Sequence, residues 1–316
     1  MTSVTRYPQT ILVACPTPWD ADLELDEPTF RTEVRAVLAA GYTDLYIFGT
    51  GGEGYAVDTA RFRRVAEVFG EEVLGKPGIR PMVGVIGLSV PIVNERIAIA
   101  HAIGFRTFQI SLPAWGAVDD IELLAFFHGV CDAWPDSRFL NYNLPRTKRV
   151  LTGQDYARIV PEIPNLVATK TTSGGLAGAE ALLRHSPELQ HFMGEGNFPH
   201  GAMLGECSLL ASYAELSPAK TNALFAAGRD RDVETLFRLQ HELQAMQTDL
   251  WAAGVTPVHM DGAYDKMLVK LGMLPGFPLR LLPPYQGYTE EDYRSEEHTS
   301  ELQSLAYLVC RLLLEK

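Results

Sequence analysis

The sequence predicts an α/β protein, a (β/α)8 TIM barrel with a C-terminal helical extension. Short apolar segments alternate with helix-length amphipathic segments about eight times along the chain of 316 residues. Such alternation is typical of a parallel sheet covered by helices. Eight units in about 215 residues fit a closed barrel better than an open doubly wound sheet. No G-x-G-x-x-G motif follows the first expected strand, which argues against a dinucleotide-binding fold.

The expected strands are apolar runs, many of them rich in β-branched residues, as in strands buried on both faces. In chain order they are TILVAC (10–15), DLYIFG (44–49), RPMVGVIG (80–87), RTFQIS (106–111), SRFLNYN (137–143), NLVATK (165–170), LQHFMG (189–194) and CSLLAS (207–212).

The expected helices lie between these strands. The segment 27–42 carries Phe30 and Val34 on one face and ends at Gly41, a plausible C-cap. The segment 57–75 begins at Asp58, a suitable N-cap, and has a similar apolar stripe. The segments 89–105 and 118–134 follow the same pattern, so helices alternate with strands as the barrel requires.

After Ser212 the pattern changes to helices without strands, over about 218–228, 231–254 and 263–272. We therefore expect a barrel over 1–215 and a truncated helical appendage over 216–293. From Arg294 the chain resembles the translation of a short-read sequencing adapter, so we exclude 294–316 from the fold. The alternative for this last segment is a genuine amphipathic terminal helix.

Composition excludes several classes of protein. The net charge of −12 disfavours a nucleic-acid or anionic-membrane partner, and no uncharged run is long enough to span a bilayer. The first ten residues contain no apolar signal core. The four cysteines show no paired spacing and no metal-binding pattern, which predicts reduced thiols in a cytoplasmic protein: Cys15, Cys131, Cys207 and Cys310.

In a barrel the chemistry is expected at the carboxyl ends of the strands. The second strand leads into FGTGGEGYAVD (48–58), whose backbone N–H groups could hold a carboxylate; an ordinary glycine-rich turn is equally consistent. The fifth ends near Tyr142, which could also be a packing residue. The sixth ends at Lys170, either a solvent-facing lysine or a desolvated nucleophilic amine.

Together these segments resemble the dihydrodipicolinate synthase / N-acetylneuraminate lyase superfamily of Schiff-base lyases. GTGGEG (49–54) resembles the family's G-T-T-G-E loop, YNLP (142–145) its Y-N-x-P motif, and VATKTTSG (167–174) its lysine strand. The motifs occur in the family's order, and the resemblance spans about residues 8–290.

The resemblance implies a role for each of these residues. Lys170 would form an imine with a 2-oxo acid, typically pyruvate, and Tyr142 would shuttle protons. Thr50 and the amides around Gly51 would hold the substrate carboxylate. The resemblance implies no cofactor and no metal, and it suggests a homotetramer or homodimer.

Departures from the family pattern concern the substrate. Gly51 stands where the family loop has a second threonine, and Trp115 lies at or next to the position of a relay tyrosine. Glu53 is expected to support the loop. The basic run that contains Arg146 (RTKR, 146–149) could bind a second carboxylate or could be a solvated loop. These departures favour another aldolase, hydratase-aldolase or dehydratase over a lysine-biosynthesis synthase.

Two other classes of function stay open on the sequence. The barrel could be a non-catalytic binder or sensor of small carboxylates that uses the same cradle. It could also be a phosphate-binding barrel enzyme without covalent chemistry, in which case oxo acids would leave Lys170 unmodified.

Overall fold

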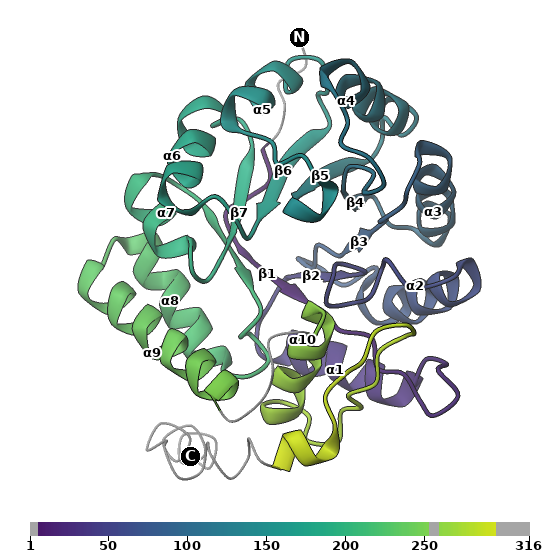
Figure 1. The fold of residues 1–316 in the computed structure, drawn as a ribbon, viewed down its shortest axis with the longest axis vertical. Coiled ribbons are helices and arrows are strands. Elements are labelled where there is room, and N and C mark those ends of the chain that lie inside the picture. Colours follow the sequence, from purple (N-terminus) through teal and green to yellow (C-terminus); the bar gives the residue numbers. More distant parts are fainter. Residues whose placement is uncertain (1–5, 253–258, 295–316) are drawn as a thin grey trace.

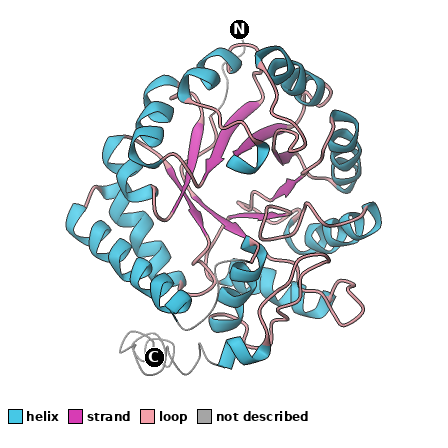
Figure 2. Ribbon diagram, viewed as in Figure 1, coloured by secondary structure: helices cyan, strands magenta, loops and turns pink. Residues whose placement is uncertain are grey.

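The computed structural model describes residues 6–252 and 259–294, and within them eight parallel strands close into a barrel (Figures 1 and 2). The strands are β1 Ile11–Ala14, β2 Asp44–Ile47, β3 Met82–Gly84, β4 Thr107–Ile110, β5 Arg138–Asn143, β6 Leu166–Thr171, β7 Gln190–Gly194 and β8 Ser208–Ala211. Each strand pairs with the next in sequence, and β8 pairs with β1 to close the sheet. The predicted (β/α)8 barrel is confirmed, and each predicted segment overlaps one of these strands; β6 extends one residue beyond its predicted end, to Thr171, so Lys170 lies within the strand.

Helices cover the outside of the barrel and follow the strands in alternation (Figure 2). They are α1 Glu27–Ala39, α2 Thr59–Val73, α3 Val90–Ile103, α4 Asp120–Phe127, α5 Gly153–Ile159, α6 Gly175–His185, α7 Phe198–Leu204 and α8 Pro218–Asp230. Asp58 caps α2 by accepting a hydrogen bond from the Arg61 amide at 2.8 Å, as predicted. Gly41, just beyond α1, has φ of +91°, the conformation expected of a C-terminal glycine.

Two apolar layers hold the barrel together. A small cluster fills its interior, with Leu12, Met82, Leu140 and Phe192 among the buried members. A much larger cluster lies between the strands and the surrounding helices. Because apolar side chains fill the interior, the barrel is a packed core, and a cavity can open only where polar residues replace them at the strand ends.

Two further helices, α9 Val233–Ala252 and α10 Asp261–Leu271, follow the barrel. Helix α9 packs on α8, while α10 lies beside the ends of β1 and β2 in Figure 1. A small apolar cluster, which includes Met267 and Leu281, joins α10 to the segment that follows it. The position of α10 determines one wall of the candidate site.

The cysteines, the helices and the acidic side chains bear on the remaining sequence-based expectations. Cys15, Cys131 and Cys207 are buried free thiols, while Cys310 and most of the adapter-like segment lie outside the described residues. None of the helices in the described ranges has the length and apolar character needed to cross a membrane. Within those same ranges, no cluster of three or more His, Cys, Asp or Glu side chains is arranged to hold a metal ion.

Candidate active site

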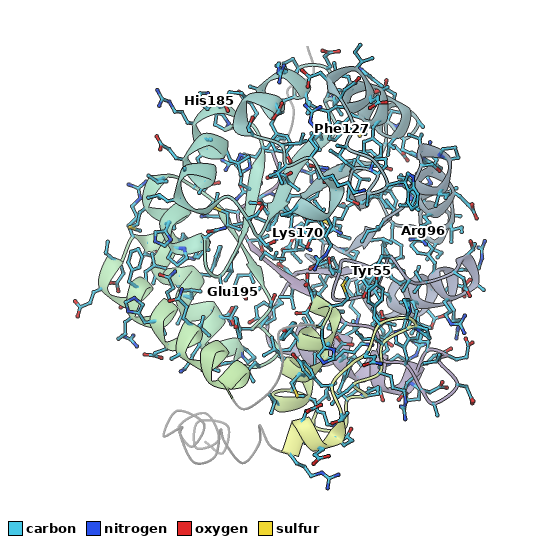
Figure 3. The ribbon with its side chains drawn as sticks, in the orientation of Figure 1. Tyr55, Arg96, Phe127, Lys170, His185 and Glu195 are labelled. Atoms are coloured by element: carbon cyan, nitrogen blue, oxygen red, sulfur yellow. The ribbon has the colours of Figure 1, made fainter. Side chains whose placement is uncertain are left out.

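The three sequence motifs meet at one cavity of about 400 Å³ at the carboxyl ends of the strands. Its lining includes residues from four parts of the fold: Tyr46, Thr50 and Gly51 from β2 and its loop, Tyr142 from β5, Lys170 from β6, and Asp261 and Asp265 from α10. Lys170 lies near the centre of the molecule in Figure 3. The convergence of distant motifs makes this cavity the candidate active site.

Lys170 is a buried amine with uncharged hydrogen-bond partners. Its side chain is only 2% exposed, so the solvent-facing alternative is wrong. Nζ donates to the Tyr46 hydroxyl at 2.8 Å and to Gln109 Oε1 at 3.1 Å. Burial lowers the pKa of Lys170 to about 7, and the nearby carboxyl groups of Asp265 and Asp261 only partly oppose this shift.

The lowered pKa gives the amine a nucleophilic form near neutral pH. A neutral amine has two N–H groups and one lone pair, and the two acceptors, Tyr46 and Gln109, account for both N–H groups. The lone pair therefore stays available for an electrophilic carbonyl in the cavity.

Gly49 gives the amine its space. A β-carbon at this position would lie 2.5 Å from the Tyr46 ring and 3.3 Å from Lys170 Nζ. Any larger residue would push the tyrosine against the lysine, so the first glycine of the GTGGEG loop is required by close approach.

Tyr142 lies next to Lys170 because their strands are in register. The two residues are paired across β5 and β6, and Lys170 Nζ lies 3.9 Å from the centre of the Tyr142 ring. The Tyr142 hydroxyl is 3.2 Å from Thr50 Oγ1. Burial raises the pKa of Tyr142 to about 12, which keeps the phenol protonated and able both to donate and to accept a hydrogen bond.

Glu53 holds the loop that carries Thr50 and Gly51 in place. This buried carboxylate accepts hydrogen bonds from Trp19 Nε1 at 2.7 Å and from the Leu282 amide at 2.6 Å, and it forms an ion pair with Lys266 at 2.5 Å. Glu53 thus joins the loop to α10, in agreement with the supporting role expected of it.

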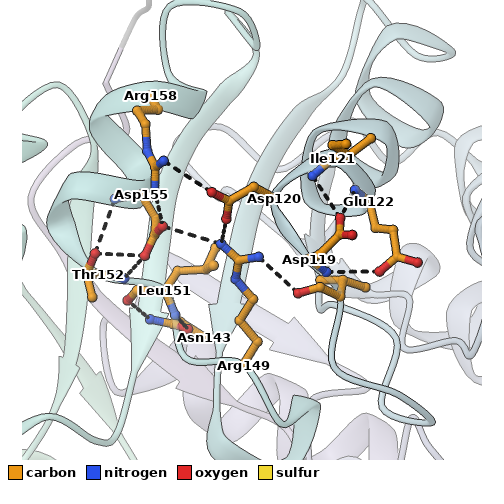
Figure 4. A network of polar contacts seen from close by, with 11 residues as sticks. Asp119, Asp120, Ile121, Glu122, Asn143, Arg149, Leu151, Thr152, Asp155 and Arg158 are labelled. Carbon is orange, nitrogen blue, oxygen red and sulfur yellow. Dashed lines mark hydrogen bonds and ion pairs between the residues drawn. The ribbon is translucent and has the colours of Figure 1, made fainter.

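The basic run 146–149 is engaged within the chain. Arg146 binds Asp261 through two hydrogen bonds of 3.0 and 2.8 Å, and Lys148 donates to the Trp115 carbonyl at 2.6 Å. Arg149 contacts Asp120 and Asp155 in the network of Figure 4. The run is therefore cross-linked to neighbouring loops, while Arg146 and Lys148 stay exposed to solvent.

That network connects the loops after β4 and β5. Asp155, which Arg149 contacts, also caps α5 through Thr152, and Asn143 at the end of β5 binds both backbone groups of Leu151 (Figure 4). The end of β5, one residue beyond Tyr142, is thereby held in place. Trp115 does not line the cavity; its side chain is 84% exposed.

Sequence reasoning missed several cavity residues. Tyr46 lines the cavity and Gln109, outside the lining, accepts a hydrogen bond from Lys170 Nζ. Both sit within expected strands, and a polar residue in the apolar run RTFQIS was a usable signal. Asp261 and Asp265 belong to a segment interpreted as a mere appendage, whereas α10 forms part of the cavity wall. The expectation that the chemistry gathers only at strand ends was therefore incomplete.

Comparison with known proteins identifies relatives along most of the chain. A sequence model of the dihydrodipicolinate synthetase family matches residues 7–281. An N-acetylneuraminate lyase of Salmonella typhimurium is 26% identical over 248 residues, which cover 78% of this chain and 83% of the relative.

Solved structures share the fold. YagE, a prophage protein of the dihydrodipicolinic acid synthase family from E. coli K12 in complex with pyruvate, has a TM-score of 0.81 at 19% identity, covering 93% of this chain and 98% of YagE. CdNal from Clostridium difficile, in complex with mannosamine, has a TM-score of 0.80 at 17% identity, covering 93% of this chain and 98% of CdNal.

Proposed function

Because the chain belongs to the dihydrodipicolinate synthetase family, we propose that it is a Schiff-base-forming lyase acting on pyruvate or another 2-oxo acid. The observation that carries the proposal is the Lys170 amine, buried at the cavity with uncharged hydrogen-bond partners and a pKa of about 7. The relatives named above include an N-acetylneuraminate lyase and a family member in complex with pyruvate, which supports the same class of chemistry.

The reaction would begin with attack of the Lys170 amine on the carbonyl carbon of the oxo acid. A C–N bond forms, the carbonyl oxygen leaves as water after it is protonated, and an iminium remains. The cation withdraws electrons, so a bond β to it can break or form through an enamine. The Tyr142 hydroxyl, beside the amine and bonded to Thr50, would carry the protons in these steps.

We further propose that the enzyme is an aldolase, hydratase-aldolase or dehydratase and not a dihydrodipicolinate synthase. Gly51 lacks the second loop hydroxyl, and the exposed Trp115 lies at or next to the expected place of a relay tyrosine. Thr50 and the Gly51 amide would bind the carboxylate of the oxo acid. Arg146 would bind a second carboxylate only after releasing Asp261.

Assembly as a homodimer or homotetramer is part of the same proposal. Two large apolar side chains, Trp115 and Ile121, are 84% and 81% exposed on the loop after β4 and the start of α4. Such exposure favours an interface between copies of the chain. Light scattering coupled to size exclusion would test it, and a strictly monomeric protein would contradict it.

The test of the function is reductive trapping with pyruvate, followed by mass spectrometry of the intact protein and its peptides. We expect one reduced pyruvyl group per chain, on the peptide that contains Lys170. Lys266 is an internal control, because it is also a buried lysine with a lowered pKa but does not line the cavity. Trapping at Lys170 would justify a screen of aldehydes and sugar acids for the second substrate. Folded protein that gives no adduct with pyruvate or other 2-oxo acids would contradict the proposal and favour a carboxylate-binding protein.

A further inference from the structure

Asp265 is a carboxyl group in the cavity that none of the sequence motifs predicts. It lies on α10, lines the cavity together with Lys170, and is half-buried. No hydrogen bond or ion pair joins its carboxyl group to another described residue, and Lys170 is not within ion-pair distance of it. A carboxyl group without a partner at the wall of a catalytic cavity is available to a ligand.

The position of Asp265 depends on the glycine at 51. A β-carbon at Gly51 would lie 1.9 Å from Asp265 Oδ2 and 2.9 Å from its Cγ. No side chain at 51 can therefore coexist with the carboxyl group in this place. The carboxyl group of Asp265 thus occupies the region that a loop hydroxyl at position 51 would fill. This region lies against the backbone expected to hold the substrate carboxylate.

The charge of the surroundings determines which form of Asp265 fits there. A substrate carboxylate bound at Gly51 would touch Asp265, and two ionised carboxylates in contact repel each other strongly. Lys170 is the only Lys or Arg side chain among the described lining residues, and Arg146 is committed to Asp261. A neutral carboxylic acid removes the repulsion and supplies an O–H donor.

The protonated form is favoured near neutral pH. Burial raises the pKa of Asp265 to about 8; Asp261 and Glu195 add to the shift, and Lys170 opposes it. The remaining titratable groups that sense Asp265 are carboxyl or phenol groups, namely Glu215 and the tyrosines Tyr46, Tyr142 and Tyr213. Burial raises the pKa of each of these four as well, which favours their uncharged forms.

We propose that Asp265 is a substrate-binding residue that holds the carboxylate of the 2-oxo acid at Gly51 through a hydrogen bond donated by its protonated carboxyl group. This inference rests on the proposed function, because the bound group is the carboxylate of the substrate that forms the imine. The acid replaces an alcohol hydroxyl in the anion cradle and makes recognition of the substrate dependent on pH.

The pH dependence follows from the two groups that face the substrate. Imine formation needs the neutral amine of Lys170, so its rate rises as the pH passes about 7. Binding needs protonated Asp265, so affinity falls about tenfold per pH unit above about 8. The profile is therefore bell-shaped, and its alkaline limb belongs to Asp265.

The experiment traps the imine with cyanoborohydride and measures the pyruvate concentration that gives half-maximal trapping, from about pH 6.5 to about 9.5. Wild type, Asp265→Asn and Asp265→Ala are compared, with circular dichroism to confirm the fold. The amide of asparagine still donates a hydrogen bond but does not titrate. We expect Asp265→Asn to bind within a few-fold of wild type at pH 7 and to lose the alkaline limb. Asp265→Ala should bind at least about tenfold more weakly, since a charge-assisted hydrogen bond is lost.

Several results would overturn the inference. These are an unchanged half-saturation in Asp265→Ala, an equal loss in the asparagine and alanine variants, or a wild-type affinity that is flat to the alkaline end. The first would show that Asp265 does not bind the substrate, and the second that the ionised form is needed. A wild-type protein that gives no adduct at any pH is a different outcome, because it contradicts the proposed function itself.

A second pair of variants tests the geometry without relying on titration. Gly51→Ser alone should weaken binding, because its β-carbon collides with Asp265. Gly51→Ser combined with Asp265→Ala removes the collision and restores a hydroxyl, so it should bind more tightly than either single variant. Additive losses would contradict the shared occupancy of this region.

Discussion

The protein contains two buried lysines, Lys170 and Lys266, whose environments make them opposites. Lys170 is 2% exposed and Lys266 is fully buried. Burial lowers the pKa of both, to about 7 and about 8 respectively. By burial and acidity alone, the two amines would be hard to tell apart.

Their partners and surroundings distinguish them. Lys266 forms an ion pair with Glu53 at 2.5 Å and also donates to the Arg280 carbonyl, and it lines no part of the cavity. Lys170 donates to an uncharged phenol and an amide oxygen beside a cavity. A lowered pKa therefore does not identify a nucleophile by itself; it does so only together with access and the absence of a bound carboxylate.

The largest expected effect comes from Lys170→Ala. Without the amine no imine can form, so we expect no turnover above background and no adduct after borohydride treatment. The fold should remain, because Lys170 forms no ion pair with any of the described residues. Kinetic assays test the loss of turnover, and thermal unfolding of the same preparation tests whether the fold remains. Turnover that survives the substitution would refute the Schiff-base mechanism.

Lys266→Met should lower stability and leave imine formation intact, the reverse of what we expect for Lys170→Ala. The substitution leaves Glu53 buried without its counter-charge, and we expect the free energy of unfolding to fall by about 3–5 kcal/mol. The protein that remains folded should still form the adduct at Lys170. Denaturant titration measures the loss. The double variant Glu53→Gln/Lys266→Met is the control and should lose less than the sum of the single variants. Stability close to wild type would show that the ion pair does not hold the loop to α10.

Tyr142→Phe affects the chemistry around Lys170 and leaves the amine in place. We expect turnover to fall by about 100-fold or more because the proton shuttle is lost, while trapping of pyruvate persists. Turnover assays report on the proton transfers, and the yield of trapped adduct reports on imine formation, so the two steps are measured separately. Tyr213→Phe, which alters another tyrosine of the cavity lining, is the matched control and should change turnover little. Unchanged kinetics in the Tyr142 variant would remove this residue from the relay.

The two lysines also show what could be predicted from the sequence. The strands were predictable because strands buried on both faces are continuous apolar runs, and the barrel brings the ends of such strands together. Lys170 and Tyr142 are neighbours because their strands follow one another, so motif order was enough to place them side by side.

The contacts made by α10 could not be predicted from the sequence. In the run AYDKMLVKLG, Asp265 and Lys266 are adjacent polar residues with nothing local to distinguish them from a solvated helix face. One lines the cavity, and the other is buried against Glu53. Both placements depend on where α10 docks on the barrel, which is set by contacts between segments far apart in sequence. Glu53 gave the only hint, as a carboxylate in a loop that needed a buried partner.

The smallest expected effect concerns Arg146, which is ion-paired like Lys266 but lies at the surface. Its guanidinium and the Asp261 carboxylate are 47% and 44% exposed, so solvent screens the pair and its contribution to stability should be below about 1 kcal/mol. Arg146→Ala should therefore unfold almost like wild type. It should need a few-fold more pyruvate for half-saturation, since Asp261 is left uncompensated in the cavity lining. Lys148→Ala is the control, because the Lys148 amine donates to the backbone carbonyl of Trp115 and to no carboxylate among the described residues. A loss of stability as large as that of Lys266→Met would contradict the conclusion that burial, and not the ion pair as such, separates the two sites.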